Sequence, residues 1–81
     1  MKAKVHGVST IQISGEYIRL DALLKFASLV STGGEAKFRI QNGEVFVGKE
    51  ECTTRGRKIR PGEVVRVDGS VILVKPQKMT V

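Results

Sequence analysis

The stretch Leu20–Gly43, LDALLKFASLVSTGGEAKFRIQNG, decides the fold because it predicts two short helices joined by a tight turn. Apolar residues in its first part recur at the i, i+3, i+4 and i+7 spacing of one helix face, namely Leu20, Leu23, Leu24 and Ala27. The first helix is therefore expected over Leu20–Leu29.

Thr32 and Glu35 mark the start of the second helix. A threonine followed three residues later by a glutamate forms a capping box, in which both side chains bind backbone N–H groups that the first turn leaves free. The second helix is expected over Gly33–Gln41. Asn42-Gly43 ends it, because glycine readily adopts the left-handed conformation found at helix C-termini.

Alternating apolar residues predict strands on both sides of the helices. Ser9–Ile18 has the pattern of a strand interrupted by a turn or bulge at Gly15. After Gly43 the short apolar runs are separated by pairs of turn residues, Gly48-Lys49, Pro61-Gly62 and Asp68-Gly69. The expected fold class is α+β, with two short helices packed on one side of a small, mostly antiparallel sheet.

One domain is expected in the 81 residues, over positions 9–75, with an N-terminal arm over 1–8 and a C-terminal tail over 76–81. A chain this short holds its fold with one apolar core only if most of its apolar residues are used for packing. Its few aromatic residues are Tyr17, Phe26, Phe38 and Phe46. We therefore expect a monomer without a catalytic cavity or a small-molecule substrate.

Cys52 is the only cysteine and His6 the only histidine, so neither an intramolecular disulfide nor a tetrahedral zinc site is expected. Catalysis is not expected, because His6 has no carboxylate near it in the sequence and Cys52 follows two glutamates, which do not favour a reactive thiolate. No apolar segment approaches the roughly 20 residues that span a bilayer, and no signal peptide is recognisable. We expect a cytoplasmic protein that needs no cofactor and no metal.

Positive charge indicates the class of partner. Fourteen Lys and Arg against eight Asp and Glu give a formal charge of +6, which suits nucleic acid or an anionic membrane surface. A membrane-surface role lacks the basic amphipathic helix with bulky apolar anchors that it requires. Four cations lie within six residues of the segment Thr53–Glu63, namely Arg55, Arg57, Lys58 and Arg60. Such a group of phosphate-binding side chains predicts an RNA contact surface, and Gly56 would let a phosphate backbone approach closely.

Several short motifs occur in the order typical of a known family: RLD at 19–21, GGEAK at 33–37, GEVFV at 43–47 and RPGEVVRV at 60–67. From about Ile18 to Val67 the chain resembles the S-four RNA-binding domain, or alpha-L motif, which recurs in ribosomal proteins, pseudouridine synthases and tyrosyl-tRNA synthetases. In its small size and in the sequence TGGEAK, the chain resembles the stand-alone YbcJ/YaaA-like branch of this family, which consists of this domain with little added. The chain departs from the wider family at Gly33-Gly34, where Ser-Arg is common, and at Gly48-Lys49, where Asn-Gly is favoured.

The resemblance implies binding of structured RNA, either ribosomal RNA, free or in an assembling ribosomal particle, or a tRNA-like RNA, through phosphate and shape contacts. Arg19 and Lys37 match cations of the family motif, and the N-terminus of the second helix offers backbone donors for a phosphate, although Glu35 competes for them. The expected RNA-binding residues are Arg19, Thr32, Gly33, Gly34, Lys37, Lys49, Arg55, Arg57, Lys58 and Arg60. The alternative is a protein-interaction adaptor whose basic face binds an acidic partner.

Phe38 lies nearly opposite Ala36 and Ile40 on a helical wheel of the second helix. An exposed aromatic side chain there would be able to stack on an unpaired base. We instead expect Phe38 to pack beneath the N-terminal segment or the C-terminal hairpin, because a domain with so few aromatic residues seldom leaves one free.

Overall fold

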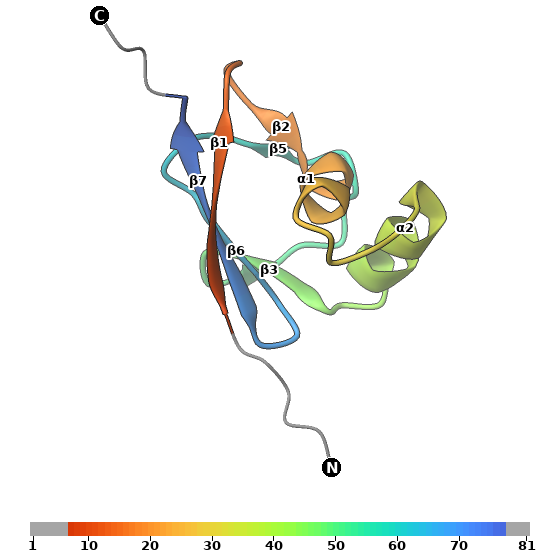
Figure 1. The fold of residues 1–81 in the computed structure, drawn as a ribbon. Helices are drawn as coiled ribbons and strands as arrows, with labels where there is room; N and C mark the ends of the chain where they lie inside the picture. The colour runs from red at the N-terminus through yellow and green to blue at the C-terminus, as the bar shows by residue number, and fades with distance from the viewer. Residues whose placement is uncertain (1–6, 78–81) are drawn as a thin grey trace, which may run out of the picture.

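The structure is a computed structural model that describes residues 7–77 (Figure 1). Two helices and seven strands follow one another along the chain: β1 (Val8–Ile13), β2 (Ile18–Arg19), α1 (Leu20–Phe26), α2 (Gly33–Gln41), β3 (Val45–Val47), β4 (Glu50–Glu51), β5 (Lys58–Ile59), β6 (Val64–Val67) and β7 (Ser70–Pro76). Positions 1–6 of the expected arm and 78–81 of the expected tail lie outside the described residues.

The strands form one sheet of five and one of two. The larger sheet has the order β1-β7-β6-β3-β4; β1 and β7 are parallel, and its other neighbouring strands are antiparallel. The smaller sheet pairs β2 with β5, with Arg19 opposite Lys58. Both helices lie on one side of the larger sheet (Figure 1). The predicted α+β fold, two short helices on a mostly antiparallel sheet, is confirmed.

The core lies between the helices and the inward face of the larger sheet. Strand residues alternate between the two faces of a sheet, and those that point toward the helices are buried: Val45, Val47, Val65, Val67, Ile72 and Val74. The helices contribute Leu20, Leu23, Leu24, Ala36 and Ile40, all of them fully buried. The apolar helix face predicted from the spacing of the leucines is therefore the face that packs.

Helix α1 is shorter than predicted, because it ends at Phe26 and not at Leu29. Ser28 has a φ of 63°, and the N–H groups of Ser28 and Leu29 donate to the carbonyls of Lys25 and Leu24. This is the Schellman arrangement, which glycine usually completes. A serine in that position gives no clear stop signal in the sequence, so the helix was predicted three residues too long.

Helix α2 has the predicted bounds. The Thr32 hydroxyl accepts a hydrogen bond from the Glu35 N–H at 3.1 Å, and Gly43 follows the helix with a φ of 82°. The Glu35 carboxylate accepts from the Ser31 N–H at 2.9 Å, one residue earlier than an ideal capping box would place it. The predicted helix start and stop are both confirmed.

The three predicted turns are also confirmed. Gly48 has a φ of 64° between β3 and β4, and Gly62 has a φ of 100° in a turn closed by a hydrogen bond from the Glu63 N–H to the Arg60 carbonyl. Asp68 and Gly69 both have positive φ between β6 and β7, as a two-residue type I′ hairpin requires.

Phe38 does not pack as predicted, because its residue surface is 65% exposed. The buried side of α2 consists of Ala36 and Ile40, which face away from it. The N-terminal strand β1 lies at the edge of the sheet beside β7, and the C-terminal hairpin is part of the sheet itself. Within residues 7–77 Phe38 thus remains largely exposed, and positions 1–6 of the N-terminal segment lie outside the described residues.

Candidate nucleic-acid interface

The loop before β5 is fixed to the start of α1. The Leu20 N–H donates to the Arg57 carbonyl at 2.8 Å, and the Asp21 N–H donates to the Arg55 carbonyl at 3.1 Å. The first N–H groups of a helix have no partner within the helix, so the loop carbonyls satisfy two of them. A segment that reads as a flexible basic loop is thereby held in one place.

Asp21 organises the two arginines nearest to this contact. Its residue surface is only 8% exposed, and its carboxylate accepts from the Ala22 N–H at 2.8 Å. Arg19 donates to both carboxylate oxygens, through Nε at 3.2 Å and Nη2 at 3.1 Å, and Arg55 donates through Nε at 3.2 Å. One largely buried acid thus holds two guanidinium groups next to each other.

Gly56 lies against one of these guanidinium groups. A Cβ atom at position 56 would come within 3.5 Å of Arg19 Nη2. We interpreted Gly56 in the sequence as a place where a phosphate backbone could approach. In the structure the Arg19 guanidinium lies beside Gly56, and an added Cβ would make only ordinary van der Waals contact with it, so Arg19 does not require a glycine at this position.

Glu63 binds the second half of the loop. Arg57 Nη2 lies 2.9 Å from Glu63 Oε2, and the other carboxylate oxygen accepts from the Arg60 N–H at 2.7 Å. Residues 55–60 contain no acid, but in the folded chain the carboxylates of Asp21 and of the nearby Glu63 reach their arginines. Two of the four cations in this segment, Arg55 and Arg57, are therefore ion-paired.

Lys58 and Arg60 are the remaining cations of the cluster, and both are exposed. Lys58 Nζ lies over the Tyr17 ring, 5.0 Å from its centroid, which is a cation–π contact. Neither side chain forms an ion pair within residues 7–77. We call the set formed by Arg19, Arg55, Arg57, Lys58 and Arg60 the basic loop surface.

The other predicted site residues lie on α2 and its N-cap, except Lys49, whose neighbours Gly48 and Glu50 line one depression together with Arg57. Lys37 is exposed on α2, and Lys49 is exposed in the turn between β3 and β4. Within the described residues, no hydrogen bond, ion pair or ring contact joins Lys37 or Thr32–Gly34 to the basic loop surface. At the N-terminus of α2, Glu35 already takes the Ser31 N–H and lies 3.8 Å from Arg39 Nε.

Sequence reasoning missed Asp21 as a part of this site. The only available signal was its place in the RLD motif, two residues after Arg19. An aspartate in the first turn of a helix is ordinarily explained by the helix dipole alone. Its contact with Arg55 spans 34 positions and depends on how the loop docks.

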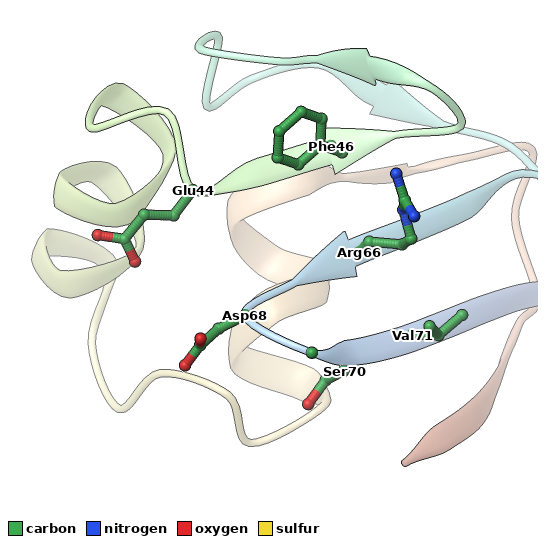
Figure 2. Close-up of a pocket in the computed structure, with 7 residues that line it drawn as sticks. Glu44, Phe46, Arg66, Asp68, Ser70 and Val71 are labelled. Carbon is green, nitrogen blue, oxygen red and sulfur yellow. The ribbon is translucent and has the colours of Figure 1, made fainter. Parts of the chain in front are cut away.

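Figure 2 shows a depression on the face of the larger sheet that points away from the helices. It has a volume of about 400 Å³ and includes Phe46 and Arg66, whose guanidinium carbon lies 5.7 Å from the ring centroid. Glu44 and Asp68 line it at one end of the sheet. Glu44 is paired with Arg39 at 3.4 Å, and Arg66 adds a positive charge, so the lining carries charges of both signs.

Within residues 7–77 no three His, Cys, Asp or Glu side chains are grouped so as to hold a metal ion. In the same range, neither helix has the length and apolar character needed to cross a membrane. Cys52 is a buried free thiol, with Sγ 3.7 Å from the Thr54 carbonyl oxygen.

Residues 11–75 match the S4 domain family, and the α+β fold of two helices on a mostly antiparallel sheet is consistent with this match. The chain belongs to this family, which confirms the resemblance seen in the sequence. A curated protein of Bacillus subtilis (strain 168), described as a probable ribosome maturation protein, RlbA, is similar to the chain with 41% identity over 59 residues. The aligned region covers 73% of this chain and 83% of that relative.

Proposed function

We propose that this protein binds structured RNA through its basic loop surface, and that the RNA is ribosomal RNA, free or in an assembling ribosomal particle. The observation that carries the proposal is the group of five cations near the start of α1, of which Arg19, Arg55 and Arg57 are held by carboxylates. Arginine side chains fixed in this way recognise phosphate groups in a defined arrangement.

Ion pairing does not disable the arginines of this surface. A guanidinium group carries five N–H donors. Hydrogen bonds to Asp21 use two of them in Arg19 and one in Arg55. Their side chains are 52% and 42% exposed. Donors therefore remain for phosphate oxygens, while the shared acid fixes their direction.

The S4 domain relationship supports the choice of RNA over other polyanions, and the name of the Bacillus subtilis relative supports a role in ribosome maturation. A tRNA-like RNA would present the same phosphate geometry. We further propose that the protein acts in the cytoplasm as a non-catalytic monomer. Lys37, Lys49 and the α2 N-terminus at Thr32–Gly34 form an outer part of the proposed surface.

The direct test is crosslinking of the protein to RNA in cells, followed by sequencing of the attached RNA. Enrichment of ribosomal RNA over other abundant RNA is expected. Purified protein should also carry material absorbing at 260 nm that ribonuclease removes. A protein-interaction adaptor would instead give no crosslinked RNA and would bind an acidic protein in the presence of ribonuclease.

A further inference from the structure

We propose that an aromatic groove beside the basic loop surface holds an unpaired nucleobase, so that the protein prefers RNA with a nucleotide displaced from its helix. The groove lies between the end of β1 and the outer side of α1 and has a volume of about 400 Å³. This inference rests on the proposed RNA-binding function and names the feature of the RNA that would be recognised.

Two exposed aromatic side chains line the groove. Tyr17 is 43% exposed and Phe26 is 63% exposed, although apolar rings in so small a domain are normally used in the core. The remaining lining residues are Gln12, Ile13, Ser14, Gly15, Ile18 and Ala22. Neutral polar groups and flat apolar rings suit a nucleobase, which has two π faces and hydrogen-bonding edges.

The groove is continuous with the basic loop surface through the two-stranded sheet. Tyr17 directly precedes β2, in which Ile18 pairs with Ile59 and Arg19 pairs with Lys58. Lys58 reaches back over the Tyr17 ring. The same short ladder therefore places phosphate-binding cations and an aromatic wall side by side, as a nucleotide with its phosphate and base requires.

Charge distinguishes this groove from the depression in Figure 2, which has the same approximate volume. That depression also contains an aromatic ring, Phe46, but charged side chains of both signs line it, namely Arg66, Glu44 and Asp68, and Glu44 is already paired with Arg39. None of the residues that line the groove at Tyr17 and Phe26 is charged. Of these two depressions, the groove at Tyr17 therefore suits an uncharged nucleobase better.

The experiment compares two RNA hairpins that differ by one unpaired nucleotide in the stem. Tyr17→Leu and Phe26→Leu each remove an aromatic face and keep an apolar side chain. Each should weaken binding of the bulged hairpin about fivefold or more, the lower end of the loss when base stacking is removed. Binding of the fully paired hairpin should not change. Phe38→Leu is the matched control, because Phe38 is as exposed as Phe26 and lies outside the groove.

Fluorescence gives an independent readout in the unaltered protein. Tyr17 is the only tyrosine and the chain has no tryptophan, so its emission reports the groove. The bulged hairpin should quench this emission more than the paired hairpin does. Circular dichroism should remain that of the parent in all three leucine variants. The urea midpoint should not change in Phe26→Leu and Phe38→Leu, because these side chains are exposed, whereas Tyr17→Leu should lower it slightly because the contact with Lys58 is lost.

The outcomes separate this inference from the proposed function. Three results would overturn the inference and leave RNA binding intact: equal binding of both hairpins, unchanged affinity in both groove variants, or a bulge-dependent loss in Phe38→Leu instead. If both groove variants bind the bulged hairpin as the parent does, the groove binds a protein partner or no ligand. If the parent binds neither hairpin, the proposed function fails, and the inference with it.

Discussion

Replacing Lys58 and Arg60 together by glutamine should flatten the salt dependence of RNA binding without unfolding the protein. Each cation that neutralises a phosphate releases condensed counterions, so its loss reduces the slope of log affinity against log salt by roughly 0.7 to 0.9. Two such losses give about 1.4 to 1.8. Between about 50 and 200 mM salt, the affinity of the parent should therefore fall about seven to twelve times more than that of the double variant.

The structure selects these two cations for the test. Lys58 and Arg60 form no ion pair within residues 7–77, so their removal leaves no acid without a partner. The cation–π contact of Lys58 with Tyr17 is at an exposed site, and its loss should cost about 0.5 to 1 kcal/mol of stability. The sequence alone favours Arg55 and Arg57, but their replacement would also free Asp21 and Glu63 and so combine loss of binding with loss of stability.

The assay is a binding titration of one structured RNA, by fluorescence anisotropy, at four or more salt concentrations. Arg66→Gln is the matched control, because it removes one charge from the acid-lined depression on the far side of the sheet and should leave the slope unchanged. RNAs of the same shape and different sequence should lose affinity alike, since phosphates carry no base identity. A double variant with the affinity and slope of the parent would refute the assignment of this surface, and Lys37 would be tested next.

Three further predictions concern stability and are measured as shifts in the urea midpoint. Asp21→Asn should cost about 1.5 to 3 kcal/mol, because two guanidinium groups lose their charged acceptor; an unshifted midpoint would mean that Asp21 does not anchor the loop. Thr32→Ala should cost about 1 kcal/mol through loss of the helix cap, and Thr32→Ser should recover most of it. Gly43→Ala should destabilise by about 1 kcal/mol or more, because its φ is 82° and because an added Cβ would overlap the Glu51 carboxylate. Gly33→Ala, with open space around it, should not; equal effects would contradict this reasoning.

The parts of the fold that local chemistry determines could be predicted from the sequence. Helix α2 and the turns at Gly48, Gly62 and Asp68-Gly69 depend on residues a few positions apart, and all were confirmed. The predicted end of α1 was wrong because Ser28 has a left-handed conformation that glycine usually adopts. The parallel pairing of β1 with β7 joins the two ends of the chain, and no local pattern specifies such a partner.

The candidate site shows the same division between local and long-range information. The cations were visible as a run in the sequence, but their partners Asp21 and Glu63 were not assigned, because ion pairs depend on side-chain geometry in the folded chain. The prediction that Phe38 is covered was wrong. The small number of aromatic residues is a property of the whole domain, and it does not determine which face of α2 is buried. The groove at Tyr17 requires the spatial proximity of β1 and α1, which no motif in the sequence indicated.

The two acids of the basic loop surface lower its charge but fix its shape. Five cations against Asp21 and Glu63 leave a formal charge of +3, so long-range attraction to RNA is weaker than the run of cations suggests. In return, Arg19 and Arg55 lose less side-chain freedom when a phosphate binds, because Asp21 already holds them. A surface arranged in this way favours an RNA whose phosphates match the fixed guanidinium groups over a flexible polyanion of equal charge. Under the proposed function, this arrangement would let a domain of 81 residues select structured RNA by shape with few contacts to base edges.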